Sequence, residues 1–249
     1  MRLVELVCFH HAGGGSASFH PLRRALATTG ISRGVEVTLT TVTLPGRGSR
    51  YGEPRYVDAD ACVRGISDEL DDLLNGPHIL LGHSMGAMLA YSLAQQRIAR
   101  GARAPEAVIV AAYPAPHSWG PMHDLHLGDD QQLAAELARY GGLPAEMLSR
   151  PEWLELLMPI VGDDLRICQS YRPSAEPPLP CPLHVFGGRN DPLAPPDTLA
   201  AWSLHSEQPQ TVRLFAGDHF LFREPDPELV AAVARIIENV DEDVARERI

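Results

Sequence analysis

Six short apolar segments alternate with longer segments of helical period along this chain, and no other feature constrains its fold as strongly. The apolar segments are residues 3–9, 35–44, 78–81, 107–112, 183–186 and 211–215. Between residues 63 and 74, and again between 229 and 237, apolar residues recur every three or four positions, as in amphipathic helices. Short apolar strands joined by helices form a mainly parallel sheet with helices on both faces. The sequence therefore predicts an α/β fold.

One long interval interrupts this alternation. Residues 113–182 contain short helical patterns such as DDQQLAAELARY and a proline-rich exit, RPSAEPPLPCP, but no strand pattern. Because α/β folds bind their ligands at the carboxyl edge of the sheet, an insertion of this size is expected to form a helical lid over that edge. We therefore expect one core from residues 1–112 and 183–249 and a lid from residues 113–182. An added packing layer with no gating role is the alternative.

Composition narrows the class of partner. A chain of 249 residues, 45% of them hydrophobic, has enough material for one large core. Its 21 basic and 32 acidic residues give a net charge of −11, the wrong sign for binding phosphates over a broad surface. Nucleic acid is therefore not expected as a partner.

The four cysteines have no pattern of a metal site or a disulfide framework. Cys8, Cys62, Cys168 and Cys181 are scattered, and no two of them form a C-x-x-C pair. We expect reduced and mostly buried thiols, no metal and no cofactor.

Signs of secretion or of a membrane span are not found either. The first residues, MRLVELVCFHHAGGG, have one arginine and a short apolar run, which fits a strand better than a signal sequence. No apolar run approaches the roughly 20 residues that span a bilayer. The default expectation is a cytoplasmic protein with no membrane contact. The sequence does not fix the oligomeric state, for which a monomer is expected.

The segment PHILLGHSMGAMLAYSLA carries the strongest local signal. It predicts an apolar strand, a Gly-His-Ser-Met-Gly turn at residues 82–86 and a helix. Such a turn needs small neighbours because its backbone is strained and closely packed, and it lifts the serine hydroxyl above the sheet. The G-x-S-x-G string is weak by itself, but the strand before it and the helix after it are the context that the turn requires. Ser84 is therefore the candidate nucleophile, and His83 fills the variable position of the turn.

A serine nucleophile needs a base to take its proton and an acid to orient that base. His219, in TVRLFAGDHFLF, follows the last predicted strand. Asp191, in PLHVFGGRNDPLAP, follows the strand before it. The chain order Ser84, Asp191, His219 is the order found in α/β-hydrolases. We therefore predict this triad on an α/β-hydrolase fold.

Acyl transfer also needs donors aimed at the oxyanion that develops on the attacked carbonyl. One is expected to be the backbone N–H of Met85, directly after the nucleophile. The other is expected from the glycine-rich loop after the first strand, where we favour the N–H of Ala12 or of a neighbour such as His11. A nucleotide-binding loop is the alternative for this glycine run, but it lacks both the G-x-G-x-x-G spacing and a GK[ST] ending.

The set of motifs resembles the type II thioesterases that accompany polyketide synthases and nonribosomal peptide synthetases. The similar stretches are CFHHAGGGSASF, LPGRGSR, GHSMGA, SYRP, FGGRNDPLAP and FAGDHFLF, which together span almost the whole chain. The resemblance implies hydrolysis of acyl groups from the phosphopantetheine arm of acyl or peptidyl carrier proteins, which removes misprimed or stalled units. It also implies a triad of Ser84, Asp191 and His219. The implied oxyanion donors are Ala12 and Met85.

The sequence departs from the family at His10-His11, where members often have proline followed by an aromatic residue. The resemblance therefore does not determine the fine shape of the acyl pocket. Physical chemistry does not separate thioesters from esters, because a triad that protonates an alkoxide also cleaves thioesters. A small-molecule carboxylesterase or lipase is therefore the alternative within the same fold. A ligand-binding receptor without catalysis is the alternative from another class, although the presence of all three triad residue types argues against it.

Several other charged residues are expected to have no catalytic role. Asp218 is expected to shape the turn before His219, and Asp163 and Asp164 are expected to face solvent or to begin a helix. Arg47, in LPGRGSR, fits an exposed charge after a tight turn, with a substrate-facing role as the alternative.

A carrier protein that is itself acidic would need a locally basic or apolar docking surface on this acidic chain. Arg97, Arg100 and Arg103, in QQRIARGARAP, are a candidate basic patch. A solvated helix end is the favoured interpretation of these three arginines, because arginine is favoured at helix C-termini.

Overall fold

The computed structural model describes residues 2–29, 35–118, 127–143, 145–174, 176–210 and 212–246, which contain a six-stranded sheet in the order β2-β1-β3-β4-β5-β6. The strands are β1 (Arg2–Phe9), β2 (Val35–Val42), β3 (His78–His83), β4 (Ala107–Ala111), β5 (Leu183–Gly188) and β6 (Val212–Phe215). All neighbouring strands in this order are parallel. The predicted α/β fold is therefore confirmed, with one strand in each predicted segment. Thr211, which begins the last predicted segment, lies outside the described residues.

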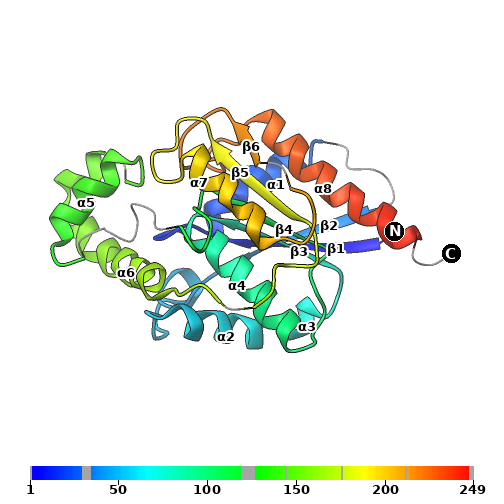
Figure 1. Ribbon diagram of the computed structural model, residues 1–249. Helices are drawn as coiled ribbons and strands as arrows, with labels where there is room; N and C mark the ends of the chain where they lie inside the picture. Colours follow the sequence, from blue (N-terminus) through cyan, green and yellow to red (C-terminus); the bar gives the residue numbers. More distant parts are fainter. Residues whose placement is uncertain are drawn as a thin grey trace.

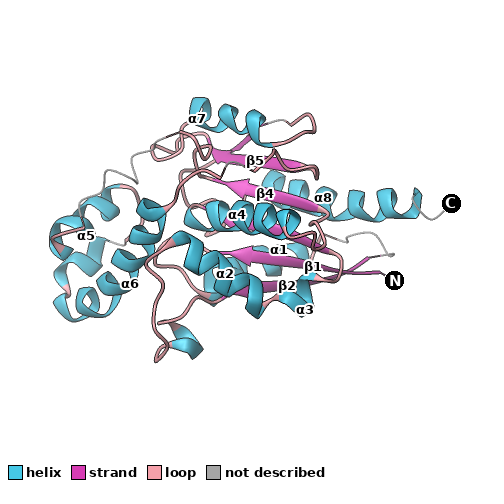
Figure 2. Cartoon of the chain, turned by 60° about the horizontal axis from the view of Figure 1, so that its bottom comes forward, coloured by secondary structure: helices cyan, strands magenta, loops and turns pink. Residues whose placement is uncertain are grey.

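Helices cover both faces of the sheet (Figures 1 and 2). One face carries α1 (His20–Leu26) and α8 (Pro227–Arg246). The other face carries α2 (Ala59–Glu69), α3 (Asp71–Leu74), α4 (Met85–Ala99) and α7 (Pro196–Ala200). Short 3₁₀ turns are η1 (Ser16–Phe19), η2 (Gly48–Arg50) and η5 (Ala201–His205). Within the described residues, no helix has both the length and the apolar character to cross a membrane.

The central strands explain why the apolar segments of the sequence are almost unbroken. Every residue of β3 and β4 is buried. Successive side chains of a strand point to opposite faces. Leu80 accordingly packs in the apolar cluster beneath α4, while Ile79 and Leu81 pack in the cluster beneath α8. A strand covered on both faces therefore needs apolar residues at consecutive positions.

The predicted insertion lies at the carboxyl end of the sheet. It contains α5 (Asp130–Arg139), the 3₁₀ turn η4 (Ala145–Ser149) and α6 (Pro151–Ser170). In the described part of residues 113–182 the only extended pairing is an isolated bridge between Leu179 and Ser206. Figures 1 and 2 show α5 and α6 at the end of the molecule opposite both chain termini. This is the edge to which parallel strands deliver their C-terminal residues. The bounds of the insertion and its role as a lid stay predictions.

Helix α6 changes character at Pro159, which lies inside it. In the first half, the side chains of Trp153 and Leu156 are 52% and 65% exposed. In the second half, Leu165 and Cys168 are fully buried against the core. Proline lacks the N–H that would bond to the preceding turn, so it weakens the helix at the junction of the two halves.

The three arginines considered as a docking patch do not form one. Arg97 is buried, because α3 brings Asp71 against the end of α4, and the Arg97 guanidinium donates to Asp71 Oδ1 at 2.8 Å. Arg103 forms an ion pair with Glu106. Arg100 is exposed at the end of α4. The favoured interpretation of a solvated helix end is therefore wrong for Arg97.

The four cysteines are free and buried.

Candidate active site

The turn at Ser84 is held by close backbone packing. Ser84 lies between β3 and α4 with φ 56° and ψ −123°. A positive φ is strained for a residue that has a side chain. A Cβ atom on Gly82 would collide with the backbone of Gly86 and Ala87, and a Cβ atom on Gly86 would collide with the carbonyl group of Phe9. Glycine is therefore required on both sides of Ser84.

The structure brings Ser84, His219 and Asp191 into one hydrogen-bonded line. Nε2 of His219 lies 2.9 Å from Ser84 Oγ, and Nδ1 of His219 lies 2.8 Å from Asp191 Oδ2. All three residues are buried. The loops that carry Asp191 and His219 are joined, because the N–H of Asn190 donates to the carbonyl of Gly217 at 3.1 Å. This arrangement allows His219 to take a proton from Ser84 while Asp191 fixes the orientation of the ring.

The backbone around Asp191 fixes its carboxylate. Oδ1 accepts hydrogen bonds from the N–H of Leu193 at 2.8 Å and of Ala194 at 3.1 Å, which leaves Oδ2 for His219. Burial raises the pKa of Asp191, but the hydrogen bonds from His219, Leu193 and Ala194 and the charge of His219 outweigh burial. The pKa therefore lies below its ordinary value, and Asp191 is a carboxylate at neutral pH.

His83 binds the backbone of the candidate base His219. Its Nε2 lies 2.6 Å from the carbonyl oxygen of His219, so the proton of the neutral ring is on Nε2 and donates to that oxygen. Burial, followed by the charge of His219, lowers the pKa of His83 to about 3. His83 is therefore a neutral hydrogen-bond donor at pH 7, which agrees with the structural role expected for it. Among the described residues, no group of three or more His, Cys, Asp or Glu side chains could hold a metal ion.

The two predicted oxyanion donors lie at the same edge of the sheet as Ser84. Met85 is the first residue of α4, so its N–H belongs to the helix start that has no partner within the helix. Ala12 follows β1 in a turn closed by a hydrogen bond from the N–H of Gly14 to the carbonyl of His11 at 2.9 Å. Ala12 and His11 both line the cavity that contains Ser84. The roles of Ala12 and Met85 as donors stay predictions.

A cavity of about 80 Å³ lies beside Ser84 and His219, and much of its wall comes from the insertion. The insertion contributes the lining residues Leu137, Tyr140, Gly142, Leu143, Leu157, Val161 and Leu165. Leu193 and Phe220 add apolar surface from the core. The sequence placed the insertion at this edge, but it carried no signal for which of its residues face the serine.

A buried ion pair that was not predicted lies between α6 and the loop after β2. Nη2 of Arg47 lies 2.6 Å from Asp164 Oδ1, and Nη1 lies 2.7 Å from Oδ2. The two side chains are only 7% and 1% exposed. The expectation that Asp164 faces solvent or begins a helix is therefore wrong, as is the exposed charge expected at Arg47. The second half of α6 packs against the core, and the two opposite charges compensate each other there.

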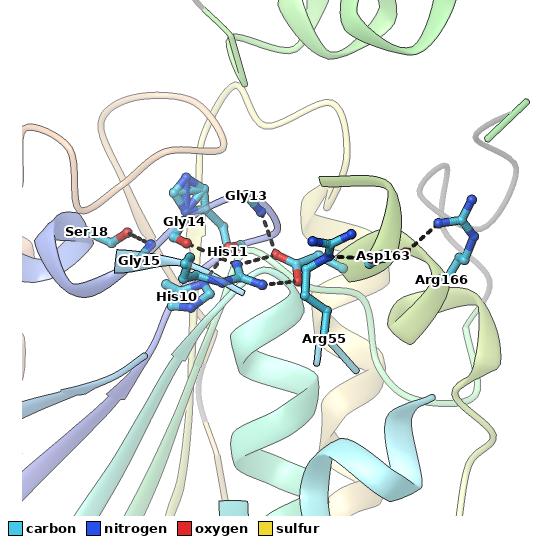
Figure 3. A network of polar contacts seen from close by, with 11 residues as sticks. His10, His11, Gly13, Gly14, Gly15, Ser18, Arg55, Asp163 and Arg166 are labelled. Atoms are coloured by element: carbon cyan, nitrogen blue, oxygen red, sulfur yellow. Dashed lines mark hydrogen bonds and ion pairs between the residues drawn. The ribbon is translucent and has the colours of Figure 1, made fainter. Parts of the chain in front are cut away.

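Asp163, the neighbour of Asp164, also lies inside α6. Its carboxylate forms ion pairs at 2.6 Å with Arg55 and with Arg166 on the outer side of the helix (Figure 3). On the inner side, the N–H of Gly13 donates to Asp164 Oδ2 at 2.8 Å. Consecutive acids of one helix therefore bind different partners, one at the surface and one in the loop that follows β1.

Comparison with known proteins agrees with this geometry. Residues 4–240 match the family model of the thioesterase domain. The gramicidin S biosynthesis protein GrsT of Aneurinibacillus migulanus is 30% identical over 227 residues, which are 91% of this chain and 86% of GrsT. The solved structure of the RedJ thioesterase from the prodiginine biosynthetic pathway of Streptomyces coelicolor has a TM-score of 0.82 at 31% identity, covering 94% of this chain and 85% of RedJ. The type II thioesterase BorB from the borrelidin biosynthetic cluster has a TM-score of 0.78 at 32% identity, covering 94% of this chain and 92% of BorB.

Proposed function

The chain belongs to the thioesterase family, and from that premise we propose that it hydrolyses acyl groups from the phosphopantetheine arm of an acyl or peptidyl carrier protein in polyketide or nonribosomal peptide biosynthesis. The observation that carries the proposal is the line of Ser84, His219 and Asp191 beside an apolar cavity. Similarity to BorB, a type II thioesterase, supports removal of misprimed or stalled units as its task. Cytoplasmic residence and a monomeric state belong to the same proposal.

The reaction proceeds in two acyl transfers. Ser84 Oγ attacks the thioester carbonyl carbon while its proton passes to Nε2 of His219, and the oxygen of the tetrahedral intermediate accepts hydrogen bonds from the N–H of Met85 and Ala12. When the C–S bond breaks, the pantetheine sulfur leaves as a thiol with the proton from His219. The thiol has an ordinary pKa of about 8.5, so it needs little help to leave.

Water then attacks the acyl-serine ester and gives its proton to His219, which returns it to Ser84 Oγ as the free acid departs. Throughout both steps Asp191 stabilises the imidazolium form of His219. The cavity beside Ser84 is lined mainly by apolar residues and favours an uncharged acyl group, because a buried charge there would have no partner.

Two alternatives use the same fold. A small-molecule carboxylesterase would hydrolyse free esters as well as carrier-bound thioesters. A ligand receptor would neither turn over substrate nor react at Ser84. A fluorophosphonate probe separates the receptor from the two enzymes, because only an activated serine is labelled.

The decisive measurement is kcat/KM for an acyl carrier protein and for the same acyl group on a small thiol, each at rising salt. We expect the carrier protein to be the better substrate, because contacts remote from the thioester contribute binding in the transition state. Weakening of the preference with salt indicates basic contacts, and a constant preference indicates apolar docking. Ser84→Ala is the control and should abolish turnover and labelling in a folded protein. Equal kcat/KM for the two substrates would favour the simple esterase.

A further inference from the structure

Asp164 is a buried acid that the reaction does not use, and its partners come from two other parts of the chain. It accepts two hydrogen bonds from Arg47 and a third from the N–H of Gly13, which lies 151 residues away in the sequence. A carboxylate that is 1% exposed needs such compensation, because burying an unpaired charge is costly. All three bonds therefore hold Asp164 in one place, and they also hold the groups that donate them.

The loop after β1 is the element held most directly. Gly13 has φ +76°, and a Cβ atom there would lie 2.7 Å from Val161 Cγ2, so α6 touches the loop backbone itself. Nη1 of Arg47 also donates to the carbonyl of Gly14 at 3.1 Å. Consecutive residues of the loop are thus fixed by Asp164 and by its counter-ion (Figure 3 shows the loop from His10 to Gly15).

We propose that Asp164 is a positioning residue, with Arg47 as its counter-ion. Through the N–H of Gly13 it holds the loop after β1 in the conformation that directs the Ala12 N–H at the oxyanion. The inference rests on the proposed function, because a donor at Ala12 matters only if Ser84 attacks a carbonyl group. The N–H of Gly13 is the amide next to that of Ala12, so fixing one restricts the direction of the other. Helix α6 of the insertion thereby supports the oxyanion site as well as the wall of the cavity.

The energetic reason lies in the narrow geometry of oxyanion donors. Loss of one such donor lowers kcat by about 10²–10³-fold, and a misplacement of about 1 Å can lower the rate about 10²-fold. His11 packs against His83 and Phe220 before Ala12, but the three residues after Ala12 are glycines, which have no side chain to restrain the backbone on that side. The bond from Gly13 to Asp164 supplies that restraint from outside the loop.

Two double variants separate positioning from simple stabilisation. Arg47→Met/Asp164→Leu and Arg47→Met/Asp164→Asn both remove the buried charges, and apolar replacement of a buried ion pair often leaves a protein as stable as before. They differ at one acceptor, because only the second variant retains an oxygen for the Gly13 N–H. Each is assayed with a p-nitrophenyl ester, which needs the oxyanion donors but no carrier protein, after circular dichroism has shown that it is folded at the assay temperature.

We expect kcat of the variant with leucine to be about 10²-fold lower than that of the variant with asparagine, with KM little changed. Inhibition by an alkyl boronic acid, whose tetrahedral adduct on Ser84 places an oxygen at the oxyanion position, should weaken by the same factor as kcat/KM. A role in stability alone would change neither quantity in folded protein. Equal kcat for the two folded variants would overturn the proposal.

A single variant covers the case in which a double variant does not fold. Asp164→Asn is then compared with Asp163→Asn, its neighbour on α6, whose partners Arg55 and Arg166 lie outside the loop after β1. In Asp164→Asn, Gly13 and Arg47 compete for one acceptor oxygen, so its kcat should fall while that of Asp163→Asn stays near wild type. Equal kcat values for these two variants would also overturn the proposal. Failure of the proposed function is seen separately in wild type: equal kcat/KM for the carrier-bound and small-thiol substrates would favour the simple esterase, and absence of labelling at Ser84 would favour the receptor.

Discussion

Replacing Asp191 by asparagine tests the triad with almost no change in shape, and the structure allows its effect to be worked out. Oδ1 accepts two backbone N–H groups, at 2.8 Å and 3.1 Å, and Oδ2 faces Nδ1 of His219 at 2.8 Å. The amide oxygen of the new side chain must occupy the Oδ1 position, because an NH₂ group there would face two donors. Its NH₂ group then faces Nδ1, so the neutral ring has its proton on Nε2. His219 in that tautomer cannot accept the proton of Ser84.

The size of the effect follows from the cost of the opposite flip. Turning the amide to restore the working tautomer leaves the buried N–H groups of Leu193 and Ala194 without an acceptor, at about 1–3 kcal/mol each. The pair therefore costs roughly 2–6 kcal/mol, which at about 1.4 kcal/mol per tenfold corresponds to a fall in kcat of roughly 30-fold to 10⁴-fold. The upper end agrees with the loss of about 10⁴ known for a triad histidine held in the wrong tautomer.

The assay is kcat for a thioester, followed through the released thiol, in Asp191→Asn and in Asp218→Asn. Asp218 is an exposed acid next to His219 whose Oδ1 accepts one backbone N–H, from Phe220 at 2.9 Å. An asparagine oxygen can accept that bond equally well, so this control should keep its activity. If kcat of Asp191→Asn stays within about tenfold of wild type, another carboxylate orients His219 and the reasoning is refuted.

Two further predictions concern stability. The pKa of His83 is lowered to about 3 in the folded protein, whereas in the unfolded chain it is about 6.5, so below that pH only the unfolded state binds the proton. The free energy of unfolding therefore has its full value above about pH 6.5 and falls as the pH drops, by about 2 kcal/mol between pH 7 and pH 5 for this residue. Urea unfolding should show a smaller fall in His83→Gln. A fall identical to that of wild type would refute the assignment. Gly86→Ala should lower the free energy of unfolding by about 3 kcal/mol, because the new Cβ meets the carbonyl of Phe9, whereas Gly52→Ala has nothing within 4 Å and should be near neutral in the same thermal melts.

The strands and the turn at Ser84 could be predicted because their causes are local in the sequence. Burial on both faces requires consecutive apolar residues, so β3 and β4 are visible as short apolar runs. The close approach of the backbone around Ser84 requires Gly82 and Gly86, which makes the turn visible as a motif. Asp191 and His219 were found because the chain order and the ends of strands limit where they can lie.

The ion pair between Arg47 and Asp164 could not be predicted in the same way, because its cause is a contact between distant segments. One signal was available in α6, where Asp164 lies on the same helical face as Val161, Leu165 and Cys168. An acid on an apolar stripe indicates a buried partner. The sequence does not say which of its basic residues that partner is, since packing alone decides it.

Pro159 marks a position in α6 at which a segment from a relative could be joined to this chain. The helix before it is largely exposed, with Trp153 and Leu156 at its surface, and the helix after it carries Asp164 and is packed on the core. Grafting residues 127–158 from a relative would exchange Leu137, Leu143 and Leu157 of the cavity wall and leave the contacts of Asp164 in place. The helix already lacks one backbone hydrogen bond at this junction, because Pro159 has no N–H. A chimera joined there should therefore need little adjustment of the backbone. Libraries built on this boundary could vary the acyl group accepted while they inherit one unchanged catalytic apparatus.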